Sequence, residues 1–318
     1  MYTSLIIGLL FLSHIIADFY LQTDEMAKEK IFNKKVLLQH AVHHCLTTFI
    51  LTIIFFSFNF FFFIVILSIL HYWIDRLKTH LQKKYNKFSI RFFLFDQLFH
   101  ITTLFLIIPY NELVKNIDFN EYYLNILEWF IKYVPALGKF NNDKWTIVLL
   151  LIAFYLFCIN GGTVVTNLFL KKSPTRQELL AEKINQIEKE REEEIYLDAR
   201  LEQAATITDN SKSNILDMSK LTSVIRETLS SMREGLFNSK TYTGGEMIGI
   251  IERLLIFSFI ILGTYVSITF VLAAKSIARL KKIEQDSEFS DKFLIGTLSS
   301  AMVAIFCGVM FNLIKGLL

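Results

Sequence analysis

Proline, glycine, cysteine and charged residues are all scarce in this chain of 318 residues. It has 3 prolines, 12 glycines and 3 cysteines, and only 20% of its residues are charged. The three cysteines lie in apolar runs, which excludes a disulfide framework and a thiolate metal site. The formal net charge of +3 is too small to indicate nucleic acid as a partner. With 31 phenylalanines and 53% hydrophobic residues, the composition excludes a soluble enzyme and predicts a polytopic membrane protein.

Long apolar segments recur along the chain. A helix needs about 20 apolar residues to cross about 30 Å of hydrocarbon. Seven segments come near this length: residues 3–20, 37–57, 59–76, 92–110, 145–170, 248–274 and 293–316. We expect Ser57, Phe58 and Asn59 to form the turn between the second and third. The first is not a signal peptide, because it lacks a basic start and carries His14 and Asp18. The predicted fold class is all-α, a transmembrane bundle of about seven spans.

The chain divides into four predicted regions. Residues 1–110 form a four-helix transmembrane bundle, and residues 111–170 hold an interfacial helix near 120–137 followed by the fifth span. Residues 171–245 are densely charged and form a soluble helical insert. Residues 246–318 supply two C-terminal transmembrane helices. The insert is a solvated spacer or, alternatively, its residues 178–206 bind a cytoplasmic protein or self-associate.

Basic residues predict the orientation of the bundle. Lysines cluster after the first span, and lysines and arginines cluster after the third, in residues 76–91. The positive-inside rule then places the N-terminus outside and the insert in the cytoplasm, in a bacterial inner membrane. Residues 275–292 conflict with this topology, since they are basic although strict alternation places them outside.

The histidines carry the strongest chemical signal. All seven lie within the first 100 residues, and ionisable groups inside membrane spans are rare and costly. Four pairs have a spacing of four, which puts both members on one face of a helix. The pairs are His14 and Asp18, His40 and His44, His71 and Asp75, and Asp96 and His100. The predicted topology places all four near the cytoplasmic leaflet, which favours a metal site in the bundle core.

The donor types limit the metal. Imidazole and carboxylate without thiolate suit zinc, manganese or iron. Eight donors exceed the four ligands of a closed zinc site, so one open site or two adjacent divalent ions fit better. The alternative is that these residues are hydrogen-bonded pairs that join the helices. His44 is a better candidate than its neighbour His43, and His80 lies off the ligand face. Gln22 and Gln97 are candidates for orienting the ligands. Lys78 is a candidate for binding an anionic substrate or, alternatively, snorkels to the headgroups.

Several of these segments resemble a family of uncharacterised bacterial integral membrane proteins. The resemblance covers about residues 1–110 and 244–300 and skips the insert. It rests on residues 14–22 (HIIADFYLQ), Lys30, 37–40 (LLQH), 71–78 (HYWIDRLK), 96–100 (DQLFH), 245–249 (GEMIG), Glu252-Arg253, 273–276 (AAKS) and 295–298 (IGTL). The histidine-bearing half is more distantly similar to predicted membrane-bound metal-dependent hydrolases of the SOS-regulated type. That likeness implies a metal site and hydrolysis.

The leading functional hypothesis is a metal-dependent hydrolase at the cytoplasmic leaflet that acts on an anionic phosphoester or lipid. An aspartate among Asp18, Asp75 and Asp96 that is not a ligand would serve as general base. An ion transporter, sensor or scaffold with an intramembrane His/Asp cluster is the non-enzyme alternative. The HxxHH run at residues 40–44 also fits a di-iron oxygenase, although this chain has only one such box.

Charged residues also flank the sixth predicted span. For Glu252-Arg253 at its start we favour a structural ion pair. We favour a structural role for Lys275 and Arg279 as well, and lipid headgroups are their alternative partner.

Overall fold

The computed structural model describes residues 2–85, 90–107, 141–170 and 243–318, with a few single positions besides. All regular structure in these ranges is helical. Residues 1–170 and 231–318 form one compact unit, which is the one described below, and residues 171–230 form another. Nearly all of the predicted interfacial helix, and the insert up to residue 242, lie outside the described residues.

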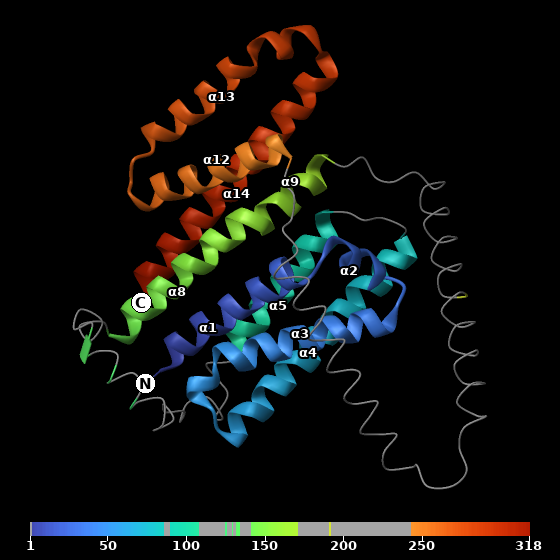
Figure 1. The fold of residues 1–318 in the computed structure, drawn as a ribbon, viewed down its shortest axis with the longest axis vertical. Helices are drawn as coiled ribbons and strands as arrows, with labels where there is room; N and C mark the ends of the chain where they lie inside the picture. Colours follow the sequence, from blue (N-terminus) through green and yellow to red (C-terminus); the bar gives the residue numbers. More distant parts are fainter. Residues whose placement is uncertain are drawn as a thin grey trace. The chain divides into compact units, whose positions relative to one another are not determined.

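Residues 3–107 form the N-terminal part of the bundle (Figure 1). A short 3-10 turn, Ile53–Phe55, separates its third and fourth helices. The helices are α1 (Thr3–Ile16), which continues into the π-helix η1 (Ala17–Leu21), α2 (Asp24–Glu29), α3 (Lys34–Leu51), α4 (Phe58–Tyr85) and α5 (Ile90–Ile107). Side-chain caps begin several of them. The Asn33 side chain, for example, accepts a hydrogen bond from the Lys35 amide at 2.9 Å at the start of α3.

The C-terminal part contains one long interrupted helix and three others. They are α8 (Asn142–Leu156), the π-helix η5 (Phe157–Gly161) and α9 (Gly162–Leu170) in continuous succession, then α12 (Gly244–Ile261), α13 (Val266–Gln285) and α14 (Ser287–Leu317). Thr243 and Glu246 form a reciprocal capping box at the start of α12, which explains why the helix begins there.

Four described segments are long and apolar enough to cross a membrane, as expected of a multi-pass membrane protein. They are Thr3–Leu21, Phe58–Lys84, Asn142–Leu170 and Phe289–Leu317. They agree with the first, third, fifth and seventh predicted spans. The second and fourth predicted spans correspond to helices α3 and α5, and their crossing of the membrane stays a prediction.

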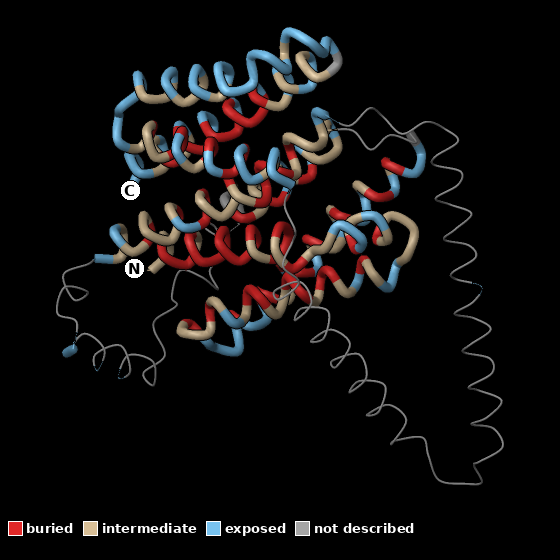
Figure 2. The backbone as a smooth tube through the Cα atoms, turned by 45° about the horizontal axis from the view of Figure 1, so that its top comes forward, coloured by how far each residue is buried: buried red, intermediate tan, exposed pale blue. Residues whose placement is uncertain are grey.

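Helix α1 lies at the centre of this unit. Of its apolar stretch, 78% is buried, against 39–44% for the other three candidate spans, and Figure 2 shows this helix almost entirely in the colour of buried residues. A helix that is hydrophobic on all sides is the kind that a core requires. It runs parallel to α8, because Ser4 contacts Asp143 at 3.4 Å at one end and the Tyr20 hydroxyl donates to the Leu156 carbonyl at 3.0 Å near the other. Two parallel helices are expected here, because three predicted membrane spans lie between α1 and α8 in the chain.

The predicted turn at residues 57–59 is wrong by several residues. Helix α3 already ends at Leu51, and the buried Phe55 lies in the 3-10 turn that follows. Ser57 instead starts α4, where its hydroxyl accepts a hydrogen bond from the Phe60 amide at 3.2 Å. At its other end α4 continues to Tyr85. Most of the basic stretch after the third span is therefore helical and not a loop.

The predicted single span at 248–274 is also wrong. Helix α12 ends at Ile261, and Gly263 follows with a φ of 73°, a backbone conformation that favours glycine. The Thr264 amide donates to the Phe259 carbonyl at 2.8 Å and the Gly263 amide to the Ile260 carbonyl at 3.2 Å, which is a Schellman motif. Helix α13 then returns alongside α12.

Two contacts fix the direction of this return. Lys275 of α13 lies 2.6 Å from Glu252 of α12, and Arg253 of α12 donates to Ser300 of α14 at 3.1 Å. A Cβ atom on Gly308 would meet Ile260, so α12 and α14 run parallel and close together. The basic residues 275–292 therefore lie at the end where α9 stops and α12 starts, which we call the insert end. Their position no longer conflicts with the positive-inside rule.

This topology can be tested by labelling single cysteines with a membrane-impermeant maleimide, after replacing the native cysteines with alanine. We expect Ser287→Cys, at the start of α14, to label from the same side of the membrane as Ser211→Cys in the insert. Lys144→Cys, at the start of α8, should label from the opposite side. Labelling of Ser287→Cys from the side of Lys144→Cys would restore one continuous sixth span.

Candidate metal centre

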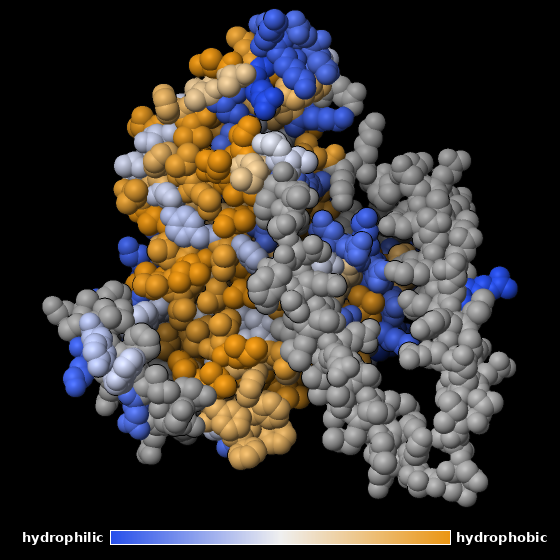
Figure 3. Space-filling view, viewed as in Figure 1, coloured by the Kyte–Doolittle hydropathy of each residue, from blue (hydrophilic) through white to orange (hydrophobic). Residues whose placement is uncertain are grey.

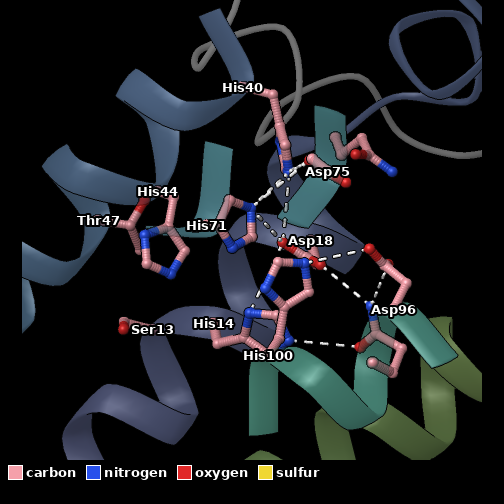
Figure 4. Close-up of polar contacts among 12 residues, drawn as sticks. Ser13, His14, Asp18, His40, His44, Thr47, His71, Asp75, Asp96 and His100 are labelled. Carbon is pink, nitrogen blue, oxygen red and sulfur yellow. Dashed lines mark hydrogen bonds and ion pairs between the residues drawn. The ribbon is translucent and has the colours of Figure 1, made fainter. Parts of the chain in front are cut away.

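The eight predicted ligands come from four helices and meet in the bundle interior (Figure 4). Each has an exposed fraction of 8% or less. Helix α1 with η1, helix α3, helix α4 and helix α5 supply two each: His14 and Asp18, His40 and His44, His71 and Asp75, and Asp96 and His100. Ligand atoms from several of them lie within 4.8 Å of one another, in groups that could hold a metal ion.

The tightest group contains Asp18, His40 and His71, with Asp75 beside it. The two Nε2 atoms of His40 and His71 are 3.1 Å apart, and they lie 3.4 and 3.6 Å from Asp18 Oδ1. Asp75 Oδ2 lies 3.3 Å from His40 Nε2 and 3.7 Å from His71 Nε2. A tetrahedral site with zinc–nitrogen bonds of about 2.0–2.1 Å has ligand atoms about 3.3 Å apart. The observed separations are close to that value.

Asp18 Oδ1 is one of two buried polar atoms of this group, with His40 Nδ1, that form no hydrogen bond with the described residues. It is buried and accepts no hydrogen bond from the residues that the structure describes, although it also lies 3.8 Å from His14 Nδ1. A buried carboxylate oxygen without a partner is costly in an apolar interior. An atom that faces three imidazole nitrogens without bonding to any of them is positioned to bind a cation together with them.

Two further groups adjoin the first and share residues with it. Asp18, Asp96 and His100 form one, in which Asp96 Oδ1 and His100 Nε2 are 3.3 Å apart. His14, His44 and His71 form the other. The His44 ring stacks on that of His71 at 4.2 Å, and its Nδ1 lies 3.5 Å from the Ser68 hydroxyl.

The remaining histidines are separate from these groups. His80 is exposed, as its spacing from His71 predicts. His43 is buried, but the groups found among the described residues contain His44 instead. This agrees with the preference that the spacing gave.

A buried lysine, Lys30, completes the site, and the spacing arguments did not find it. Its Nζ atom contacts both carboxylate oxygens of Asp75 at 2.9 and 3.0 Å and donates to Gln22 Oε1 at 2.6 Å. The short helix α2, which is capped by Thr23, brings the chain back towards α4. Lys30, directly after this helix, therefore contacts Asp75. The only signal for Lys30 in the sequence was that it belongs to the residues that resemble the uncharacterised family. Gln22 thus orients Lys30, whereas a role in orienting the ligands was predicted.

Lys78 and Gln97 both contact the acidic residues. Lys78 Nζ lies 2.6 Å from Asp96 Oδ2 and 4.0 Å from Asp75, and its side chain is 15% exposed, so it points inward and does not snorkel. The Gln97 amide donates to Asp18 Oδ2 and to Asp96 Oδ2, both at 3.2 Å. Its Oε1 faces His14 Nε2 at 3.3 Å. Gln97 therefore connects Asp18 of the first group with Asp96 of the second, and its role in orienting metal ligands stays a prediction.

The charges of this centre do not balance. Three aspartates and two lysines give a net charge of −1 when the imidazoles are neutral. One divalent cation would change this to +1 and two would change it to +3. The residues present therefore fit at least one divalent cation, and a loaded site would in turn attract an anion.

The two π-helices support the backbone of the site. Wide π turns release a backbone carbonyl and occur often at functional sites. In η1, the Phe19 carbonyl accepts a hydrogen bond at 3.0 Å from Asn160 of η5. In η5, the Cys158 and Ile159 carbonyls accept hydrogen bonds from Arg253 at 2.6 and 3.2 Å. Arg253 lies so close to Gly162 that a Cβ atom there would come within 2.6 Å of its Nε atom.

Glu252 and Arg253 have the structural role predicted for them, and each connects α12 to a different neighbour. Glu252 pairs with Lys275 at 2.6 Å, and Arg253 binds the η5 carbonyls together with Thr163 and Ser300. Adjacent residues on a helix point in different directions, so each reaches a different neighbour.

Comparison with known families gives a match over the histidine-bearing half. Residues 6–130 match the model of a family described as "Protein of unknown function (DUF3307)". All eight predicted ligands, with Lys30 and Lys78, lie inside this range. No curated protein and no solved structure matches the chain. The match agrees with the resemblance to an uncharacterised family and assigns no activity.

Replacing Lys30 with alanine leaves the buried Asp75 carboxylate without its cation. We expect a loss of about 3–5 kcal/mol in the free energy of unfolding of the metal-free protein, because a buried charge then lacks its partner. Thermal unfolding in detergent measures the loss. Lys28→Ala, which removes an exposed lysine from the same short helix, should have almost no effect. Equal stability of the two variants would contradict the role given to Lys30.

Proposed function

We propose that this protein is a membrane-embedded, metal-dependent hydrolase that acts on an anionic phosphoester or lipid at the cytoplasmic leaflet. The observation that carries the proposal is Asp18 Oδ1, which accepts no hydrogen bond from the described residues and lies 3.4–3.8 Å from three imidazole nitrogens of three different helices. Hydrogen-bonded pairs that merely join helices would not leave that oxygen without a bond.

The first ion would be bound by Asp18, His40 and His71. Two imidazoles and one carboxylate with a remaining open position are the ligand pattern of catalytic sites, and the donors suit zinc, manganese or iron. Such an ion makes a coordinated water nucleophilic near neutral pH and polarises an ester or phosphoryl oxygen. A second ion would fit Asp18, Asp96 and His100, with His14 and His44 as the remaining imidazoles.

Asp75 is our candidate for the general base. Lys30 holds both of its oxygens, and Oδ2 also lies within 3.7 Å of the two histidine nitrogens. A carboxylate fixed beside the ligands can accept a proton from a water at the open position. Lys78 is more exposed than Lys30, with an exposed fraction of 15%, and would bind the anionic group of the substrate.

Metal content tests the first half of the proposal. We expect the purified protein to contain one or two divalent ions per chain by elemental mass spectrometry, and Asp18→Asn to lose them because Asp18 is shared by two groups. Gln97→Ala should weaken metal affinity about 10–100-fold, since Gln97 only orients ligands. His80→Ala is the matched control, with unchanged content. A folded wild-type protein that binds none of the three metals would sink the proposal.

Activity tests the second half. The metal-loaded protein should cleave a phosphodiester or phospholipid substrate, and Asp75→Asn should lower kcat about 10²–10⁴-fold while retaining metal. Lys78→Gln should mainly raise KM, because it removes a charge that binds the substrate. Lys281→Gln, an exposed lysine on α13, serves as the control. A metal-loaded protein that hydrolyses neither substrate but carries the cation into proteoliposomes would favour the transporter alternative. The deep burial of the ligands also agrees with a transporter.

A further inference from the structure

A cavity lies outside the candidate metal centre, in the C-terminal part of the unit. It has a volume of about 880 Å³, is open on one side and is lined by residues of α9, α12, α13 and α14. Its walls are mostly apolar, with Leu255, Phe270 and Val271 among the lining residues. This volume is within the range of small-molecule binding sites, which are about 300–1,000 Å³.

Helix α13 borders this cavity and is only partly packed, through Ile268 and Leu272, against α12 and α14. None of its residues is buried, and Phe270 and Ile277 are 76% and 73% exposed. Phe270, Ala274 and Ala278 line the cavity and are four residues apart, so one face of α13 is directed towards it. A helix that presents apolar side chains to an unfilled space has room for an apolar ligand.

The cavity has a polar end and an apolar end. Arg279 and Lys292 are exposed and line it at the insert end, whereas Phe270 and Val271 line it about 12–14 Å further along α13, at 1.5 Å per residue. Figure 3 shows the same change of character, because polar residues gather where α13 ends and hydrophobic residues cover the adjoining helices. This is the polarity of a lipid, with its headgroup at the membrane surface.

Charge and hydrogen bonding select an anionic ligand. Four basic residues and two acidic ones line the cavity: Arg253, Lys275, Arg279 and Lys292, and Glu246 and Glu252. Lys275 pairs with Glu252, and Arg253 donates to backbone and hydroxyl oxygens, whereas Arg279 and Lys292 line the mouth of the cavity. Deeper inside, the buried Thr297 hydroxyl makes no hydrogen bond within the described part of the chain. It lies five residues beyond Lys292 on α14, where it could donate a hydrogen bond to an ester carbonyl of a ligand.

We propose that this cavity binds an anionic phospholipid, with its phosphate at Arg279 and Lys292, an ester carbonyl at Thr297 and an acyl chain between α12, α13 and α14. Bound lipid adds contacts between α13 and the bundle to those that Lys275, Ile268 and Leu272 already make. The site is separate from the metal centre, and none of its residues belongs to the proposed hydrolase machinery.

Native mass spectrometry of the delipidated full-length protein tests this proposal. We expect phosphatidylglycerol to bind more tightly than phosphatidylethanolamine, and Arg279→Gln to weaken phosphatidylglycerol binding about fivefold, the effect of one basic residue at a membrane surface. Lys281→Gln is the matched control. It removes one charge from the same helix, but Lys281 is exposed and does not line the cavity. Equal effects of these two variants, or equal affinity for the two lipids, would overturn the proposal.

Two further measurements exclude other occupants. Ala274→Trp, which fills the cavity, should abolish lipid retention while the unfolding temperature stays near that of the wild type, and unchanged retention in the folded variant would count against the site. Inorganic phosphate should compete poorly, because it lacks the acyl chain. Complete displacement of the lipid by millimolar phosphate would show a simple anion site and contradict lipid binding.

Discussion

Three carboxylates inside an apolar bundle are the constraint on which the N-terminal half depends. A buried ionised carboxylate is tolerated only when charges and hydrogen bonds compensate it. Lys30 and Lys78 compensate Asp75 and Asp96 directly, at distances of 2.6–3.0 Å. The short helix α2, which begins at its capping residue Thr23, brings Lys30 back to the core. Among the described residues, the Gln97 amide bonds one oxygen of Asp18, and the other oxygen accepts no hydrogen bond and faces three imidazoles, where it is positioned to bind a cation.

The sequence predicted the meeting of the four helices because both signals behind it are local. A spacing of four places two donors on one face, and basic residues at the span ends set the direction of each helix. The features that were missed depend on distant partners or on the backbone. Lys30 meets Asp75 45 residues later, which no local pattern reveals. The π-helices have no residue signature. The turn at Gly263 was detectable, since a glycine directly after a helical run is a common C-terminal signal, but the apolar residues on both sides concealed it.

The two halves of the unit are joined at the backbone of the metal centre. The matched family region ends at residue 130, yet Asn160 bonds the Phe19 carbonyl next to Asp18, and Arg253 bonds the carbonyls of the π turn that contains Asn160. Each of these side chains satisfies a carbonyl that a regular α-helix would have used internally. The wide turn that holds Asp18 is therefore stabilised by residues outside the histidine-bearing half. Gly162 is required by the same chain of contacts, because any side chain there would displace Arg253.

The direction of the helices places both polar sites towards one end. Asp18 lies near the end of the α1 segment and His40 near the start of α3, and α1 is parallel to α8, which leads through α9 to the insert. Arg279 and Lys292 lie at that same end through the return of α13. Helix α4 continues ten residues beyond Asp75 and carries further lysines there. Positive charge at the end of the bundle where the ligands lie would raise the local concentration of anions there, on the side where the partly exposed Lys78 contacts Asp96.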